Sequence, residues 1–290
     1  MSRALKPKTS NTSNTSTPLD LYSGIIADPI FTPALVEQIA SVQEFTRHTE
    51  RFVNQIVDGT IRDGVLQGPP GLGKSYQVGQ ALKRKNLKSN QDYVIVKGHM
   101  APTDLYLTMN AFRRKGQIVV LDDCDDLLIK DVALEVLKAA CDTDTRYVCW
   151  SSRQTPCVNG VPIKDFTFNG TMIICTNMSL RTGTNGRRDT AANAFLSRLG
   201  FWDMKLGGRE RGYAQIFNMI VYEDYLNRNP ETTLTDPQKK ELLVFLLSNL
   251  DDIRYLDLRM PQMVARMMVA HPAQWQHTAR HMITHGQGAI

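Results

Sequence analysis

Residues 68–75 read Gly-Pro-Pro-Gly-Leu-Gly-Lys-Ser, a complete G-x-x-x-x-G-K-S sequence. The apolar pair Val65-Leu66 precedes it and an amphipathic stretch follows, so the pattern predicts a strand, a glycine-rich turn and the start of a helix. Glycines let successive backbone N–H groups face an anion, and the helix N-terminus adds a positive dipole. This stretch predicts a phosphate-binding loop for a nucleoside triphosphate. The residues expected to line the nucleotide are Gly68, Pro69, Pro70, Gly71, Leu72, Gly73, Lys74, Ser75 and Tyr76.

Two side chains of this loop have specific predicted roles. Lys74 would place a point charge beside the β- and γ-phosphates, where it assists catalysis, and the Ser75 hydroxyl would ligate Mg²⁺. The alternative is a chance glycine-rich turn. All fixed positions of the pattern match between a strand-like and a helix-like segment, which favours nucleotide binding. We therefore expect ATP and Mg²⁺ as the bound groups.

A second acidic segment follows an apolar run. Residues 118–121 read Ile-Val-Val-Leu and are typical of a buried parallel strand, which would deliver Asp122 and Asp123 to its C-terminal end. Asp122 is expected to hold Mg²⁺ through water, and Asp123 to polarise the attacking water as general base. For Asp125 and Asp126 we favour an exposed cap of the next helix and leave them out of catalysis.

Strand and helix patterns alternate along the middle of the chain, which predicts an α/β fold with a parallel sheet wrapped by helices. The predicted strands cover 65–66, 93–96, 118–121 and 172–176, and the predicted helices 76–86, 104–114 and 132–140. Residues 146–168 alternate irregularly around prolines and an Asn-Gly pair, which predicts a hairpin insertion.

The character of the chain changes towards both ends. The start is too polar to fold alone, and from 207 onward helical patterns alone remain, at 213–226, 237–250 and 261–270. The predicted organisation is a disordered tail over 1–20, a helical lead-in over 21–54, an α/β nucleotide-binding domain over 55–206 and a helical lid domain with a C-terminal tail over 207–290.

Composition bounds the class of protein. The 290 residues are 42% hydrophobic and 22% charged, as in soluble globular proteins. No apolar run approaches the ~18 residues of a membrane span, and no apolar signal segment begins the chain, so we expect a cytoplasmic protein without membrane contact. The five cysteines show no C-x-x-C pair and are expected to be reduced. The net charge of +5 permits nucleic-acid contact without requiring it.

The order of phosphate loop, acidic strand, strand ending in Asn177 and helical tail resembles the AAA+ superfamily of ring-forming ATPases over residues 50–270. The resemblance implies a parallel-sheet P-loop NTPase core with an all-helical C-terminal lid. It implies that Asn177 acts as sensor 1, positioning the attacking water. Arg198, in the segment 194–198, is similar to an arginine finger that reaches the γ-phosphate of a neighbouring subunit. Arg259 is similar to sensor 2, which contacts the nucleotide from the lid.

Several points stay open within this resemblance. The residues that compete with Arg198 for the finger role are Arg187, Arg188, Arg209 and Arg211. Most AAA+ members carry Glu where this chain has Asp123, and the shorter side chain makes slow hydrolysis plausible. The finger implies a homo-oligomer, either a ring or a spiral, with a hexamer as one expected size.

Two segments are candidates for contact with a substrate polymer. One is Lys97-Gly98-His99-Met100, and the other is the predicted hairpin. In the hairpin, cations alternate with aromatic rings, which suits nucleic acid, although such rings also pack against the domain. The hairpin residues considered are Arg146, Arg153, Lys164, Tyr147, Trp150, Phe166 and Phe168.

The compact layout is similar to AAA+ proteins of DNA replication and recombination, including branch-migration motors, helicase loaders and phage-encoded ATPases. This resemblance implies a motor or loader that acts on DNA. The alternatives are an ATP-driven protein-remodelling chaperone and a weakly hydrolysing, nucleotide-gated scaffold.

Overall fold

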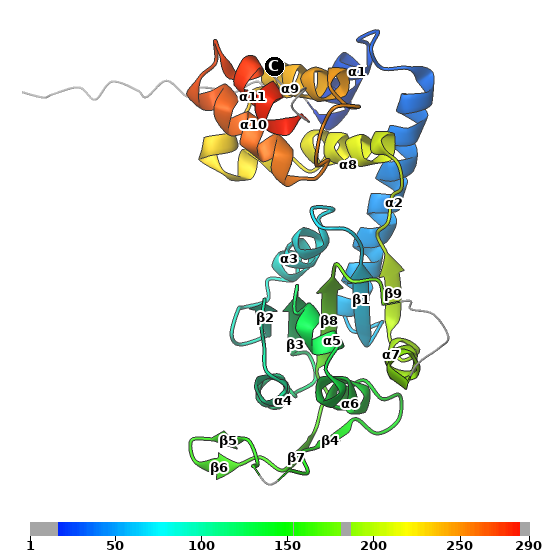
Figure 1. The fold of residues 1–290 in the computed structure, drawn as a ribbon, viewed down its shortest axis with the longest axis vertical. Coiled ribbons are helices and arrows are strands. Elements are labelled where there is room, and N and C mark those ends of the chain that lie inside the picture. The colour runs from blue at the N-terminus through cyan, green and yellow to red at the C-terminus, as the bar shows by residue number, and fades with distance from the viewer. Residues whose placement is uncertain (1–16, 153, 181–186, 285–290) are drawn as a thin grey trace, which may run out of the picture. The chain divides into compact units, whose positions relative to one another are not determined.

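The computed structural model describes residues 17–152, 154–180 and 187–284, with the side chains of 187–191 left out. The chain divides into two compact units. We call Gln43–Gly207 the α/β unit, and Met1–Val42 together with Gly208–Ile290 the helical unit. Figure 1 labels their helices and strands.

The α/β unit is built on a five-stranded sheet in the order β2-β3-β8-β1-β9, and all neighbouring strands are parallel. The strands are β1 (Asp63–Gln67), β2 (Tyr93–Lys97), β3 (Ile118–Asp122), β8 (Thr171–Thr176) and β9 (Gly200–Asp203). The predicted α/β class with a parallel sheet is therefore confirmed. The edge strand β9 was not predicted, because its four residues are too few to show a period.

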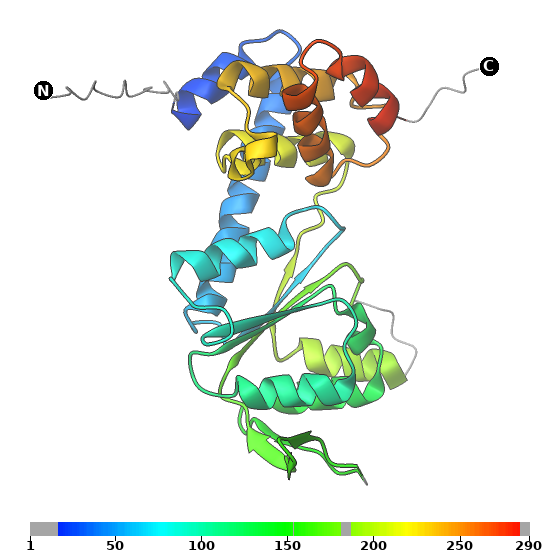
Figure 2. The same cartoon turned by 90° about the vertical axis from the view of Figure 1, so that its left-hand side faces the viewer.

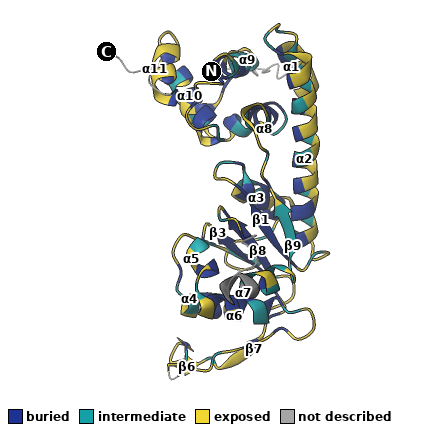
Figure 3. Ribbon diagram, turned by 45° about the vertical axis from the view of Figure 1, so that its right-hand side comes forward, coloured by how far each residue is buried: buried dark blue, intermediate teal, exposed yellow. Residues whose placement is uncertain are grey.

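Side chains of successive strand residues point to opposite faces of the sheet, and each face is covered by helices (Figure 2). Leu66 and Val120 pack with the C-terminal half of α2 and with α3, whereas Val65 and Val119 pack with α4 to α7. The central strands β1, β3 and β8 are consequently buried on both sides, whereas the edge strands β2 and β9 are half-buried to exposed (Figure 3). The helices are α2 (Pro33–Val57), α3 (Lys74–Arg84), α4 (Pro102–Ala111), α5 (Asp125–Leu128), α6 (Asp131–Ala140) and α7 (Arg187–Leu196).

The hairpin insertion predicted over 146–168 is present before β8. It consists of β4 (Tyr147–Cys149) paired with β7 (Asp165–Thr167), and β5 (Cys157–Val158) paired with β6 (Val161–Pro162), both antiparallel. The two-residue turn Asn159-Gly160 has φ values of 51° and 79°. Positive φ at both positions is what a tight hairpin turn of this length requires, and Asn-Gly supplies it at low cost.

A buried ion pair joins the base of this hairpin to the start of β1. The Arg146 guanidinium donates to both oxygens of Asp63 at 2.9 and 2.8 Å and to the carbonyl of Gly170 at 3.0 Å. The side chains of Arg146 and Asp63 are only 3% and 1% exposed. Burial raises the pKa of the Asp63 carboxyl, and the guanidinium opposes that shift. Such a pair is costly to break from one side, because the remaining charge stays buried.

Replacing Arg146 by Met should lower the free energy of unfolding by about 3–5 kcal/mol near neutral pH, since Asp63 then lacks its counter-charge. A raised pKa in the folded state penalises folding at pH values above the ordinary Asp pKa, so the loss should shrink as the pH falls toward that value. Urea unfolding across pH measures this. The double variant D63N/R146M is the control, and an equal loss in both variants would show that packing, not charge, is responsible.

The helical unit contains α1 (Pro18–Ile26), the first part of α2, α8 (Arg209–Val221), α9 (Asp236–Ser248), α10 (Arg259–Ala270), α11 (Trp275–Ile283) and the 3₁₀ turns η1 (Tyr225–Arg228) and η2 (Pro230–Thr232). The tail was predicted to reach residue 20, but α1 begins at Pro18 behind a capping box of Thr17 and Asp20. Residues 1–16 lie outside the described residues.

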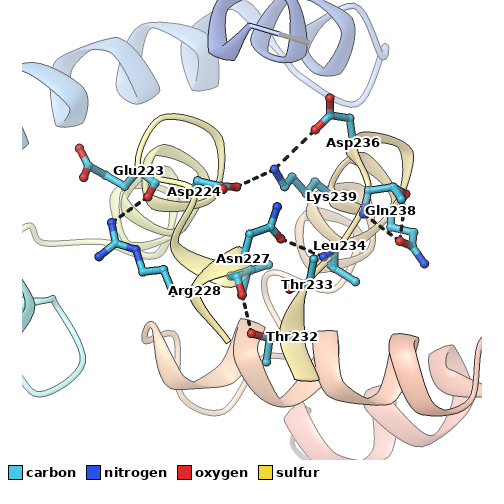
Figure 4. A network of polar contacts seen from close by, with 12 residues as sticks. Glu223, Asp224, Asn227, Arg228, Thr232, Thr233, Leu234, Asp236, Gln238 and Lys239 are labelled. Carbon is cyan, nitrogen blue, oxygen red and sulfur yellow. Dashed lines mark hydrogen bonds and ion pairs between the residues drawn. The ribbon is translucent and has the colours of Figure 1, made fainter. Parts of the chain in front are cut away.

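A polar network fixes the start of α9 against η1 and η2 (Figure 4). The buried Lys239 ammonium lies 2.8 Å from Asp224 and 3.5 Å from Asp236, and Leu234 N–H donates to Asn227 at 2.9 Å.

Within the described ranges, no helix combines the length and apolar character needed to cross a lipid bilayer.

Candidate active site at the carboxyl edge of the sheet

The phosphate loop, residues 68–75, connects β1 to α3 at the edge where the strands end, which we call the carboxyl edge (Figure 1). Gly71 and Gly73 have φ values of 76° and 90°, a left-handed conformation that L side chains rarely adopt. Gly73 is also the N-cap of α3 and makes no side-chain cap. The backbone N–H groups of Lys74 and Ser75, at the start of α3, can therefore face an anion.

The other predicted nucleotide-binding residues differ in exposure. Pro69, Pro70 and Ser75 are exposed, Tyr76 is half-buried in the first turn of α3, and Leu72 is buried. Leu72 packs in the core between the sheet and α3, so it anchors the loop rather than offering a contact surface.

Lys74 lies buried across the loop. Its ammonium donates to the carbonyls of Gly68 at 2.7 Å and Pro69 at 2.9 Å, and to the side-chain oxygen of Asn177 at 2.7 Å. Burial lowers the pKa of Lys74, while the nearby carboxylates oppose the shift. The cation is thus held between the loop and the end of β8, where phosphate oxygens can replace neutral carbonyls as its acceptors.

Asp122 joins the phosphate loop to β3. The Ser75 hydroxyl donates to its Oδ1 at 2.5 Å, and the Lys97 ammonium lies 2.9 Å from its Oδ2. Its carboxylate is 4% exposed. A hydroxyl and a carboxylate this close form a hard oxygen pair of the kind Mg²⁺ uses, so the two predicted metal ligands are brought together and fit the ion.

Asp123 and Asn177 meet at the same edge. The Asn177 amide Nδ2 donates to Asp123 Oδ1 at 2.8 Å, while its oxygen accepts from Lys74. Asp123 is exposed and has a φ of 56°, a left-handed conformation that Asp tolerates better than most residues. Its backbone N–H donates to Cys175 at 3.0 Å. Asn177 therefore connects the predicted base to the lysine of the phosphate loop.

Lys97, at the end of β2, was considered in the sequence only as a polymer contact and was missed as a partner of Asp122. The hydrogen bond to Asp122 raises the pKa of the Lys97 ammonium, which stays a cation at neutral pH. A cation on this carboxylate competes with a metal ion for the same oxygen. The signal available in the sequence was its place directly after the predicted strand 93–96.

We expect Lys97→Met to lower the Mg²⁺ concentration needed for half-maximal nucleotide binding. The Lys97 side chain is 67% exposed, so its ion pair is worth up to about 1 kcal/mol, which corresponds to about a fivefold shift. Nucleotide binding titrated with Mg²⁺ measures the shift, with Lys97→Arg as the charge-preserving control. A higher Mg²⁺ requirement in Lys97→Met would mean that the ammonium assists the metal site.

Of the two acidic residues after Asp123, Asp126 is exposed as expected and Asp125 is not. Asp125 is half-buried and accepts a hydrogen bond from the Thr176 hydroxyl at 2.5 Å, and Asp126 accepts from His99 at 2.8 Å. The N-cap of α5 is Cys124, without a side-chain cap. The prediction of an exposed cap at Asp125 was wrong, because the parallel pairing of β3 with β8 places Thr176 beside it.

Arg198 follows the end of α7. Its guanidinium donates to the carbonyl of Ala194 and lies 3.5 Å from Asp142, and the side chain is 30% exposed. Of its competitors, Arg209 is engaged by the carbonyls of Leu250 and Ile253. The side chains of Arg187 and Arg188 lie outside the described residues.

Arg259, the predicted sensor 2, begins α10 of the helical unit and is exposed. Its backbone N–H donates to Asp257 at 2.9 Å. Contact of its guanidinium with a nucleotide stays a prediction.

The hairpin residues considered for contact with nucleic acid divide into a buried set and an exposed set, and Tyr147 and Lys164 are exposed. Arg146, Phe166 and Phe168 are buried, and the Arg146 guanidinium lies 5.0 Å from the ring centre of Phe168. Trp150 packs on the ring of Tyr106 with centroids 5.2 Å apart. Arg153 lies outside the described residues. The buried members of the set thus pack within the α/β unit, which was the alternative, and contact of Tyr147 and Lys164 with nucleic acid stays a prediction.

The fold and this edge together define an α/β P-loop core with an additional helical unit. The fold implied by the AAA+ resemblance is thereby confirmed, from the parallel sheet, the phosphate loop, the acidic end of β3 and Asn177 after β8. No protein-family model matches the chain.

The chain is similar to a protein of Enterobacteria phage T4 described as an uncharacterized 36.7 kDa protein of the nrdC-mobD intergenic region. Identity is 26% over 243 residues, covering 81% of this chain and 74% of that protein. Among solved structures it is similar to the RuvB Holliday junction branch migration motor of Thermotoga maritima, with 13% identity and a TM-score of 0.44. The match covers 86% of this chain and 68% of that chain. It is also similar to domain III of the Thermotoga maritima replication initiation protein DnaA, with 14% identity and a TM-score of 0.43. That match covers 92% of this chain and 97% of the DnaA domain.

Proposed function

We propose that this protein binds ATP with Mg²⁺ at the carboxyl edge and hydrolyses it. The proposal rests on one arrangement, in which Lys74, Asn177 and Asp123 form a continuous hydrogen-bonded series beside the Ser75–Asp122 pair. This arrangement supports a phosphate cradle, a pair of metal ligands and a carboxylate base at one end of the sheet. Ligands of open α/β sheets bind at this end.

Each residue has a defined role in this proposal. The first turn of α3 and Lys74 would hold the β- and γ-phosphates, and Ser75 with Asp122 would hold Mg²⁺, which would supply charge neutralisation at the phosphate oxygens. Asn177 orients the attacking water, and Asp123 takes its proton. A bond forms between the water oxygen and the γ-phosphorus, and the bond to the bridging oxygen breaks. ADP leaves with that electron pair.

We further propose a homo-oligomeric ring or spiral that acts on DNA as a motor or loader. Its support is the resemblance in motif order, the basic net charge of +5 and the candidate finger Arg198. The similarity to a phage protein supports a phage-encoded protein that works in the host cytoplasm.

Arg198→Ala should leave ATP binding within about twofold of wild type and lower turnover roughly 10³-fold, if the guanidinium completes a neighbouring subunit's site. Wild-type turnover should also rise more than linearly with protein concentration. Arg47→Ala, which removes an exposed cation of α2, is the control. Strictly linear turnover that survives Arg198→Ala would favour a monomeric ATPase.

Steady-state ATP hydrolysis with single-stranded DNA, duplex DNA and RNA, each at low and moderate salt, tests the polymer assignment. Salt-sensitive stimulation by DNA is expected, because counterion release makes affinity fall steeply with salt. Clear basal turnover without stimulation by any of the three would overturn the DNA assignment.

One observation favours protein remodelling as a second candidate. Val158 at the end of β5 and Val161 at the start of β6 flank the Asn159-Gly160 turn and are 42% and 61% exposed. Apolar side chains at an exposed tip suit a protein partner better than a phosphate backbone. Replacing both by Ser should then abolish turnover stimulation by the partner and leave DNA stimulation unchanged.

A further inference from the structure

A second hollow of the α/β unit lies at the opposite end of the sheet from the candidate active site. It has a volume of about 830 Å³. Its walls come from the α2–β1 connection, the segment that leads into β3, and the segment that leads into β8. Ile118 and Thr171, the first residues of β3 and β8, line it. We call this hollow the amino-edge cavity.

The cavity is positively charged. Arg62, Arg114 and Lys115 line it and are exposed, and none of the three makes an ion pair with another residue that the structure describes. The one acidic residue among its lining, Asp58, accepts a hydrogen bond from the backbone of Thr60 at 2.9 Å. Hydrogen bonds from Thr60 lower the pKa of Asp58. The lining thus carries three exposed cations that form no ion pair within the described part of the chain, against one carboxylate that already accepts hydrogen bonds from Thr60.

The walls are held in place by hydrogen bonds between the segments that form them. Asn169 N–H donates to the carbonyl of Arg113 at 2.7 Å, and Thr171 N–H donates to Gln117 at 2.8 Å. Behind the wall, the buried Arg146 guanidinium donates to Gly170. Cationic side chains on segments whose backbone is fixed by hydrogen bonds lose less conformational entropy on binding an anion than those on unconstrained loops.

The lining residues indicate the class of ligand. None of the described side chains that line the cavity is aromatic, so it offers no platform for stacked bases. Its apolar side chains are limited to Val57 and Ile118, the latter only 2% exposed, which is too little for the apolar centre of a protein interface. Guanidinium groups instead match phosphate geometry. We propose that the amino-edge cavity binds the phosphodiester backbone of duplex DNA, independent of base sequence.

This inference rests on the proposed action on DNA, and it names the surface that holds the polymer. The test compares the full chain with the variant R62Q/K115Q. The matched control is R47Q/K83Q, which removes two exposed cations of α2 and α3 that do not line the cavity. Binding of a labelled duplex and of a labelled single strand is measured by fluorescence anisotropy over a salt series.

We expect R62Q/K115Q to bind the duplex about tenfold more weakly and the dependence of log affinity on log salt to fall by about 2, one for each lost phosphate contact. The control should stay within about twofold of wild type. Nucleotide binding at the carboxyl edge should be unchanged in both, which shows that they are folded. If R62Q/K115Q does not fold, the single variant Lys115→Gln should lower the slope by about 1.

The remaining outcomes separate two kinds of failure. Wild-type protein that hydrolyses ATP and binds duplex DNA, with R62Q/K115Q equal to the control, would overturn the cavity assignment alone. Wild-type protein that binds no DNA would overturn both this inference and the DNA assignment. Polyglutamate is the competitor, added at the same charge concentration as the duplex. If it displaces the duplex, and if R62Q/K115Q also fails to bind it, the cavity is a site for acidic peptides instead.

Discussion

Lys74→Ala is expected to abolish both nucleotide binding and turnover. The Lys74 ammonium is buried and lies between two carbonyls of the phosphate loop and Asn177. Its loss removes the cation that faces the phosphates and disconnects the loop from the end of β8. Each charge-assisted contact to phosphate at such a site is worth about 1.5–3 kcal/mol, or about tenfold to a hundredfold in affinity, so loss of the contacts to both phosphates should abolish detectable binding.

Titration with a fluorescent ATP analogue measures this affinity, and ATP turnover is followed in parallel. Lys83→Ala removes an exposed lysine in the last turn of the same helix, α3, and should change neither quantity. Unfolding curves of both variants separate lost binding from lost structure. Wild-type affinity in a folded Lys74→Ala protein would remove the basis of the phosphate-loop assignment.

Asp123→Asn is expected to keep nucleotide binding while turnover collapses by about 10²–10⁴-fold. Asn accepts the left-handed backbone that Asp123 adopts, and its side-chain oxygen can still accept the hydrogen bond from Asn177. The substitution therefore removes the proton acceptor and leaves the geometry in place. Affinity for ATP should stay within about threefold, because the exposed carboxylate is not a contact of the phosphate loop.

Asp126→Asn is the matched control, since Asp126 is also an exposed carboxylate after β3 but pairs with His99. Single-turnover hydrolysis separates the chemical step from product release. Unchanged turnover in Asp123→Asn would place the base elsewhere. Asp123→Glu tests the short side chain of the base, and a large gain in turnover would support a weakly hydrolysing scaffold in the wild type.

The central strands could be predicted because they are buried on both faces and read as continuous apolar runs, as Ile118 to Leu121 does. The glycine pattern of 68–75 predicted the loop because few sequences satisfy those backbone angles. By contrast, β9 forms on the edge of the sheet by pairing with β1, and that pairing depends on residues more than 130 positions away in the chain.

The residues of the candidate active site could be predicted only where they lie at the ends of strands that the sequence itself indicates. Asp122, Asp123 and Asn177 follow strands that the sequence shows, and parallel pairing brings their ends together. The contacts of Lys97 and Asp125 depend on which strands are neighbours, which no local pattern encodes. Arg146 was misjudged because a buried, paired guanidinium and an exposed one look alike in sequence.

The central claim is Mg²⁺-dependent ATP hydrolysis at the carboxyl edge. The most direct test is steady-state ATP turnover by the full chain with Mg²⁺ and with EDTA, beside Lys74→Ala measured under the same conditions. Turnover that requires Mg²⁺ and disappears in Lys74→Ala is the predicted result. Absence of turnover together with absence of Mg²⁺-dependent ATP binding in the folded wild-type protein would contradict the account.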